Sequence, residues 1–107
     1  MTKISFLYPN SQGRRFDLEY YVEKHMPSSI DLLSVHPVFR GVSVEREVSA
    51  GAGREAPPYI AVCNYLFETF DDFLAAVTPH MALLRAHVSN YTDIEPVVQI
   101  SEVVVSR

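Results

Sequence analysis

Cysteine is almost missing from the sequence, which holds a single thiol, Cys63, in 107 residues. One cysteine excludes a disulfide within the chain and a zinc site built from several cysteines. Its apolar and aromatic neighbours, Val62 and Tyr65, predict a buried, unreactive thiol rather than a nucleophile. Such cysteine usage is typical of a reducing compartment, so we expect the protein to be cytoplasmic.

Long apolar runs and an excess of basic residues are also lacking. No apolar stretch approaches the roughly 20 residues of a membrane-spanning helix, and the apolar part of the first residues is too short for a secretory signal. Nine lysines and arginines are outnumbered by 13 aspartates and glutamates, which gives a formal net charge of −4. Nucleic-acid binding needs a basic surface. We therefore expect neither a nucleic acid nor a membrane as partner.

The composition that remains is typical of a globular protein, with 48% hydrophobic and 21% charged residues. The length predicts one domain over residues 1–107. Turn-forming residues delimit four expected strands, at residues 3–8, 39–48, 59–67 and 97–105, with a long hairpin loop at 49–58. With a helical run after the first and the third strand, the order is βαββαβ. This order predicts an α+β, ferredoxin-like fold with a four-stranded antiparallel sheet.

Both expected helical runs contain a proline. The first begins with Asp17 as N-cap, and its apolar positions at helical spacing are Leu18, Val22, His25 or Met26, and Ile30. Pro27 should end or kink this helix near His25 and restart it toward Leu33. The second run is expected to open at residues 71–72, to restart at Pro79 and to end at residues 90–93.

The strand pattern predicts a partner. In a ferredoxin-like fold two helices cover one face of the sheet, and the other face would here expose valine, tyrosine and phenylalanine side chains to water. Exposing several such side chains forgoes several kcal/mol at about 25 cal/mol per Å². A second copy packed sheet to sheet about a two-fold axis would bury them. We therefore expect a homodimer through the open sheet face.

The densest group of polar and aromatic residues spans residues 16–27. Tyr21 and His25 are four residues apart, so they are neighbours on one helix face. Histidine titrates near neutrality, and an adjacent phenol can donate or accept a hydrogen bond, so the pair can move a proton or polarise a carbonyl. The alternative is that His25 caps the carbonyl groups at a helix end. We take His25 and Tyr21 as candidate catalytic residues.

Aromatic residues on the strands are candidates for a binding pocket. Tyr8, Tyr59, Tyr65 and Phe67 could line an apolar pocket, although aromatic residues on strands are more often plain core. Gln99 is a polar residue in an apolar strand and needs a partner. We take Tyr8, Tyr20, Tyr65, Phe67 and Gln99 as candidate substrate-binding residues.

No cofactor or metal is expected from the residue pattern. His80 and His87 lie two helical turns apart, but no carboxylate or third histidine stands at ligand spacing beside them. Residues 51–56 match a loose dinucleotide-binding pattern, yet that pattern requires a helix to follow, and here Pro57, Pro58 and a strand follow.

The chain resembles a known family. Phe16-Asp17-x-x-Tyr20-Tyr21-x-x-x-His25-Met26-Pro27 is similar to the signature of the EthD family, which is named for a protein of bacterial ethyl tert-butyl ether degradation. The segment Asn90-Tyr91-Thr92-Asp93-Ile94-x-Pro96-Val97-Val98-Gln99-Ile100-Ser101-Glu102-Val103 resembles the passage from the family's last helix into its last strand. The opening Phe6-Leu7-Tyr8-Pro9 also fits, so the resemblance covers nearly the whole chain.

This resemblance implies a dimeric α+β barrel with a pocket between sheet and helices in each protomer. Relatives in that superfamily include cofactor-independent monooxygenases, muconolactone isomerases and polyketide cyclases, and EthD proteins are linked to small-molecule catabolism, often with an oxidoreductase label. By the same resemblance His25 is the candidate acid or base, and Tyr20 and Tyr21 are its hydrogen-bonding or gating partners. The fold alone does not choose the chemistry.

Three functions are compatible with these residues. The first is a cofactor-independent enzyme that acts on a small hydrophobic or aromatic metabolite, by oxidoreductase, monooxygenase-like or isomerase-like chemistry. The second is a non-catalytic module that binds or sequesters such a metabolite, in which His25 would be bonded to backbone carbonyls. The third is a purely structural dimer, which predicts no cavity large enough for a ligand.

Overall fold

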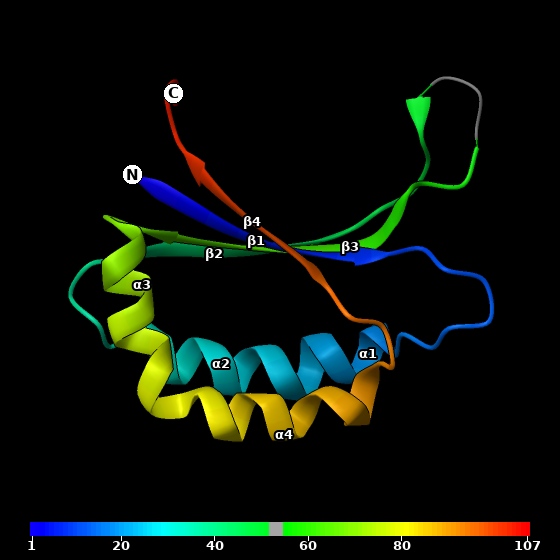
Figure 1. Cartoon of the computed structure of the whole chain (residues 1–107), viewed down its shortest axis with the longest axis horizontal. Helices are drawn as coiled ribbons and strands as arrows, with labels where there is room; N and C mark the ends of the chain where they lie inside the picture. The colour runs from blue at the N-terminus through cyan, green and yellow to red at the C-terminus, as the bar shows by residue number, and fades with distance from the viewer. Residues whose placement is uncertain (52–54) are drawn as a thin grey trace.

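The computed structural model, which describes residues 1–51 and 55–107, consists of an antiparallel sheet above a layer of helices (Figure 1). The four strands are β1 (Thr2–Pro9), β2 (Phe39–Arg46), β3 (Tyr59–Phe67) and β4 (Val97–Glu102). They lie in the order β2-β3-β1-β4, and every neighbouring pair is antiparallel. The predicted α+β fold with a ferredoxin-like, four-stranded antiparallel sheet is therefore confirmed.

The ends of two strands differ from the sequence-based expectation. β4 stops at Glu102 instead of residue 105, because Glu102 pairs with Thr2 near the start of β1 and no partner strand continues beyond it. Val104 is accordingly 84% exposed. β2 stops at Arg46 instead of residue 48. In the hairpin connection Ala50 bridges to Glu55, while residues 52–54, part of the rejected dinucleotide pattern, lie outside the described residues.

The first helical run passes Pro27 without breaking. It consists of α1 (Leu18–Tyr20), a π-helical turn η1 (Tyr21–His25) and α2 (Met26–Leu33). Pro27 has no N–H, and in an α-helix its ring would clash with the carbonyl four residues back. The turn before it is widened, so that the Met26 N–H donates to the Tyr21 carbonyl five residues earlier. The expected interruption is at the expected place, but it widens the helix and does not end it.

The second helical run is tightened at Pro79, whereas the first is widened before Pro27. It consists of α3 (Phe70–Val77), a tight 3-10 turn η3 (Thr78–His80) and α4 (Met81–Tyr91). Its N-cap is Thr69, whose hydroxyl accepts the Asp72 N–H at 3.1 Å.

No helix in the described part of the chain is long and apolar enough to cross a membrane.

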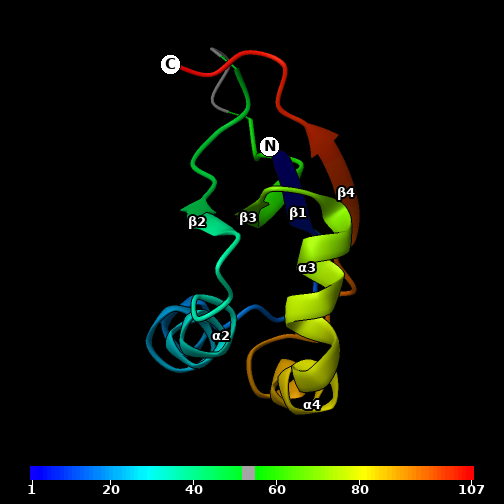
Figure 2. The ribbon, with the colours of Figure 1, turned by 90° about the vertical axis from the view of Figure 1, so that its left-hand side faces the viewer.

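The described helices all lie on one side of the sheet (Figure 2). The strand register places the aromatic side chains of the sheet on this covered face, together with the most buried aliphatic ones: Ile4, Phe6, Tyr8, Ala61, Cys63, Tyr65 and Phe67. The open face carries aliphatic side chains, Leu7, Ile60, Val62, Leu66 and Val97, around polar and charged ones, Lys3, Ser5, Ser43, Glu45, Asn64 and Gln99. The expectation of tyrosine and phenylalanine on the open face was therefore wrong.

Candidate active site

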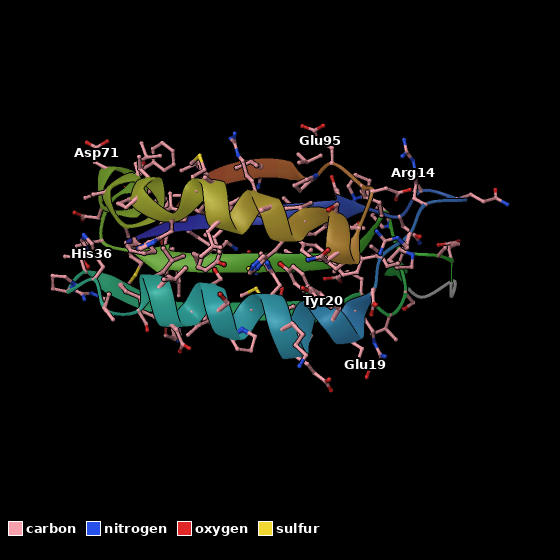
Figure 3. The ribbon with its side chains drawn as sticks, turned by 90° about the horizontal axis from the view of Figure 1, so that it is seen from below. Arg14, Glu19, Tyr20, His36, Asp71 and Glu95 are labelled. Carbon is pink, nitrogen blue, oxygen red and sulfur yellow. The ribbon has the colours of Figure 1, made fainter. Side chains whose placement is uncertain are left out.

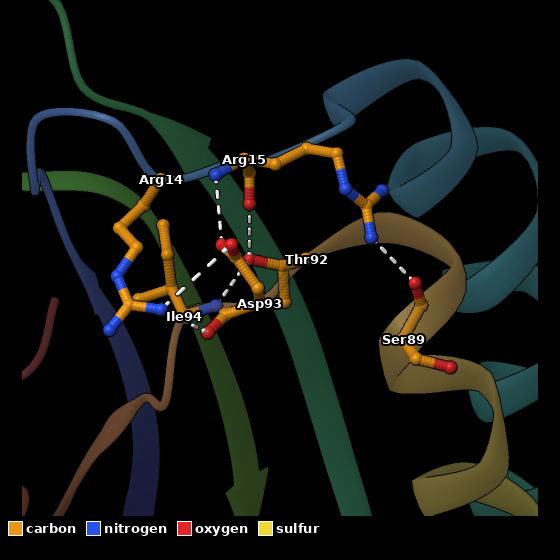
Figure 4. A network of polar contacts seen from close by, with 6 residues as sticks. All are labelled: Arg14, Arg15, Ser89, Thr92, Asp93 and Ile94. Carbon is orange, nitrogen blue, oxygen red and sulfur yellow. Dashed lines mark hydrogen bonds and ion pairs between the residues drawn. The ribbon is translucent and has the colours of Figure 1, made fainter.

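Two segments that are far apart in the sequence are joined at one end of the helix layer (Figure 4). The backbone N–H of Arg15 donates to the Asp93 carboxylate at 2.9 Å, and the Thr92 hydroxyl donates to the Arg15 carbonyl at 2.6 Å. The Arg15 guanidinium donates to the Ser89 carbonyl at 2.6 Å, which caps the end of α4. The backbone N–H of Arg15, and then the charge of Arg14, hold the pKa of Asp93 below its ordinary value.

This junction buries an aromatic cluster against the sheet. The Asp17 N–H donates to the Tyr91 carbonyl at 2.6 Å, which fixes the end of α4 beside the start of α1. The Tyr91 ring is 1% exposed and packs edge-on against Tyr21, with ring centroids 4.7 Å apart. Its hydroxyl lies 3.2 Å from that of Tyr8 on β1. The two segments thus bring three phenol rings together.

The π-helical turn sets the position of His25. Tyr21 begins the turn and His25 ends it, and their rings stack nearly parallel, with centroids 5.4 Å apart and planes at 19°. Tyr91 packs on the same imidazole at 4.8 Å. His25 is 8% exposed, and its Nδ1 atom is buried without a hydrogen-bond partner. Because π-helical turns are frequent at functional sites, this geometry singles out His25.

A partly open cavity of about 520 Å³ lies between the sheet and the helices. This volume is in the range of small-molecule sites, roughly 300–1,000 Å³. The polar groups of its wall are supplied by Tyr8, Tyr21, His25, Ser29, Cys63, Tyr65 and Tyr91. Apolar side chains such as Phe6, Leu33 and Phe73 line the rest, with Arg85 and Glu95 as exposed lining residues.

Burial keeps the inner groups of the cavity neutral. It lowers the pKa of His25 from 6.5 to about 4, with a smaller contribution from the neighbouring His87. It raises the pKa values of Tyr8, Tyr21, Tyr65 and Tyr91, so these phenols stay protonated. It also raises the pKa of the Cys63 thiol to about 11. At neutral pH the cavity therefore presents a neutral imidazole surrounded by hydroxyl groups.

Four of the seven site residues expected from the sequence meet in this cavity: His25, Tyr21, Tyr8 and Tyr65. Tyr65 extends from β3 toward α2, and its hydroxyl lies 2.6 Å from that of Ser29.

The other three lie elsewhere. Tyr20 is not among the residues of the cavity wall, and its hydroxyl accepts a hydrogen bond from the Asn90 amide at 3.0 Å. Phe67 is fully buried at the end of β3, where its ring packs 5.5 Å from those of Phe39 and Phe73. Gln99 pairs with Ser5 and is therefore on the open face of the sheet, exposed.

Several lining residues were missed by sequence reasoning. Ser29 and Leu33 continue the four-residue spacing of Tyr21 and His25, and this repeat was the available signal. The predicted stripe instead included Val22, which is 48% exposed, because the π-helical turn moves the buried face by one residue. The pattern around Tyr91 predicts only the end of a helix and does not indicate contact with His25.

The comparisons with known proteins agree with this architecture. The EthD domain model matches residues 11–95. An EthD-like protein from Ralstonia eutropha JMP134 has a similar solved structure, with 37% identity, a TM-score of 0.90 and coverage of 99% of this chain and 94% of that one. No curated protein matches the chain.

Two more distant structures share the fold alone. An ethyl tert-butyl ether degradation family protein from Bacillus halodurans C-125 is 19% identical, with a TM-score of 0.70 and coverage of 95% and 97% of the two chains. A cofactor-independent oxygenase from Streptomyces nogalater is 15% identical, with a TM-score of 0.57 and coverage of 98% and 93%. On the family match and the 37% identity, the chain belongs to the EthD family.

Proposed function

We propose that this EthD-family protein is a cofactor-independent enzyme that moves a proton on a small hydrophobic or aromatic metabolite, in oxidoreductase-like or isomerase-like chemistry. One observation carries the proposal. The imidazole of His25 lines a cavity of about 520 Å³, and its Nδ1 atom is not tied to any described group. A histidine that merely capped a helix would be bonded to backbone carbonyls.

His25 is suited to act as a general base. Its pKa, lowered to about 4, keeps the imidazole unprotonated at neutral pH. In an apolar cavity the imidazolium is disfavoured unless a negative charge forms beside it. Proton transfer is therefore favoured when the substrate itself becomes an anion, such as an enolate or a phenolate. A positioned base of this kind contributes roughly 10²–10⁴-fold to the rate.

The hydroxyl groups around His25 can stabilise that anion. Tyr8 and Tyr91 form one pair at 3.2 Å, and Tyr65 forms another with Ser29 at 2.6 Å. Protonated phenols in a low-dielectric site are effective donors to a developing oxyanion. Tyr21 has a different role, because its ring is stacked on the imidazole and fixes its orientation. The cofactor-independent oxygenase from Streptomyces nogalater shows that this fold supports catalysis without a cofactor.

The alternative is a binding module that sequesters a hydrophobic metabolite, which the same cavity would serve. A purely structural dimer is disfavoured because it predicts an inner space filled by the protein's own side chains, and the protomer holds a cavity large enough for a ligand.

We also propose a homodimer formed through the open sheet face, where Val62, Leu7 and Val97 form an aliphatic row that no described helix covers. Sedimentation at micromolar concentration should give about twice the protomer mass of 12.1 kDa, and a monomer would contradict this proposal. The cytoplasmic location stays a prediction from the sequence.

The enzymatic proposal is tested first by identifying a ligand. Native mass spectrometry of the purified protein, followed by extraction, should identify a small hydrophobic compound. That compound is then incubated with the wild-type protein and with the His25→Ala and Tyr20→Phe variants, with and without oxygen. We expect turnover by wild type and by Tyr20→Phe, because Tyr20 is not among the residues of the cavity wall and its hydroxyl is bonded to Asn90.

The His25→Ala variant should bind the compound without converting it. Undiminished turnover by His25→Ala would contradict the role of His25 as base. Binding without conversion by the wild-type protein would favour the binding module.

A further inference from the structure

Two histidines from different helical runs contact each other beside the cavity. His25 lies in η1 and His87 in α4, with ring centroids 5.9 Å apart and ring planes at 75°. The Nδ1 atoms of both rings are buried and have no hydrogen-bond partner. Buried polar atoms are almost always satisfied in folded proteins. Two unsatisfied nitrogen atoms on neighbouring rings therefore call for a functional explanation.

The two rings border different spaces. His25 lines the cavity, whereas His87 is not part of the cavity wall and is half-buried. α4 runs beside the first helical run within the helix layer, as seen from below the sheet (Figure 3). His87 thus contacts the cavity-lining imidazole and is itself partly exposed to solvent.

Few groups near His25 can take a proton from it. Tyr21 stacks on its ring, Tyr91 packs on it from α4, and the sheet contributes Tyr8, Cys63 and Tyr65 to the same cavity. Burial raises the pKa of each of these groups, so each already holds its proton.

The charged lining residues, Arg85 and Glu95, are exposed, and neither is in ring contact with His25. His87 is in ring contact with His25, and a neutral imidazole has one unprotonated ring nitrogen that can accept a proton. His87 is therefore the suitable proton acceptor for His25.

We propose that His87 is the proton exit of the site, which takes from His25 the proton removed from a substrate and passes it to solvent. This inference rests on the proposed function of His25 as general base. In the proposed resting pair His25 carries its proton on Nδ1, and His87 presents the lone pair of its own Nδ1. With the ring centroids 5.9 Å apart, the two nitrogen atoms reach hydrogen-bond distance only when one side chain shifts toward the other, so the transfer requires a small side-chain movement.

The proton count balances over one passage. When Nε2 of His25 accepts the substrate proton, the ring becomes an imidazolium. Its Nδ1 proton then moves to Nδ1 of His87, and His87 releases its Nε2 proton to water. One proton enters and one leaves, and both rings end neutral with their protons on the opposite nitrogen atoms. The reverse shift or a ring flip restores the starting tautomers.

The test measures how fast the ring N–H of His25 exchanges with water, by NMR on protein labelled with ¹⁵N-histidine and without any substrate. In the wild-type protein the exchange should be fast. In His87→Phe and in His87→Gln it should slow on the order of 10²-fold, the size of a positioned acid–base contribution. His80→Phe is the matched control, because His80 lies on the same helical run and makes no ring contact with His25. It should exchange like wild type.

Glutamine separates the two possible roles of His87. Its carbonyl oxygen can accept the hydrogen bond from His25 but cannot pass a proton on, so slow exchange in His87→Gln supports the relay. Fast exchange in His87→Gln would show a structural partner and would overturn the proposal, as would unchanged exchange in His87→Phe when circular dichroism shows that it is folded. Because no substrate is involved, this outcome is independent of turnover by His25→Ala, which tests the enzymatic proposal.

Discussion

The two faces of the sheet are made by alternate residues of the same strands, yet they differ in chemistry. The covered face brings tyrosine, phenylalanine and Cys63 against the helices and encloses the cavity. The open face carries a polar row, in which Ser43, Asn64, Ser5 and Gln99 are aligned across the four strands, beside an aliphatic row of Val62, Leu7 and Val97. The aromatic hydroxyls are thus concentrated where a ligand can be enclosed. The aliphatic row lies where a second sheet can pack.

The largest difference between the faces should appear in two neighbouring residues of β3. Phe67 is fully buried between Phe39 and Phe73, while Leu66 lies half-buried on the open face. Phe67→Ala should lower the free energy of unfolding by about 3–5 kcal/mol, because it leaves a cavity in the core. Leu66→Ala should cost about 1 kcal/mol in the protomer. Urea denaturation at low protein concentration measures the free energy of unfolding of both variants. Equal losses would contradict the expected difference between the two faces.

A charge on the open face should act on assembly rather than on the protomer. Val62→Glu places a carboxylate in the aliphatic row that the proposed dimer buries, so we expect the dissociation constant to rise about 100-fold, or about 2.7 kcal/mol. Val22→Glu is the control, because Val22 is 48% exposed on the helix layer. Sedimentation equilibrium compares the two variants. A dimer that tolerates Val62→Glu must use another surface.

The covered face should make stability depend on pH through His25. Its pKa is about 4 in the folded protein and near 6.5 when unfolded, so between these values the unfolded chain binds a proton that the native protein does not. The free energy of unfolding therefore falls as pH drops from 6.5 toward 4, by about 1–3 kcal/mol. The control is His25→Gln, which should lack this part of the pH dependence. Parallel curves for the two proteins would mean that His25 titrates normally.

The smallest expected difference is between the stability costs of replacing two buried serines, Ser29 and Ser5. The Ser29 hydroxyl pairs with that of Tyr65 inside the core, and its loss leaves the phenol with a weak contact to the Met26 sulfur at 3.9 Å. Ser29→Ala should cost about 1–2 kcal/mol. On the open face Asn64 accepts from Ser5 but also donates to Glu45, so Ser5→Ala should cost about 0.5 kcal/mol. Thermal denaturation resolves the difference, and a larger loss for Ser5→Ala would reverse the expected order.

Much of the fold could be predicted because it depends on local sequence patterns. Strand alternation, the helix caps and the two prolines predict the order of the elements and the places where the helices are interrupted. The type of helical turn at each interruption could not be predicted in this way. Pro27 follows a widened turn and Pro79 lies in a tight one, although both prolines interrupt a helical run of similar pattern. The widened turn before Pro27 is the reason why the predicted apolar stripe included the exposed Val22 and did not include the buried Ser29.

The sequence by itself determined the βαββαβ order and the pairing of Tyr21 with His25, since each depends on residues within a few positions of one another. Tertiary structure alone decided which sheet face holds the aromatic residues, and it placed Tyr91 and His87 against His25 from a segment more than 60 residues away. Contacts of that range depend on strand register and on how the helix layer seats on the sheet. No local spacing encodes them.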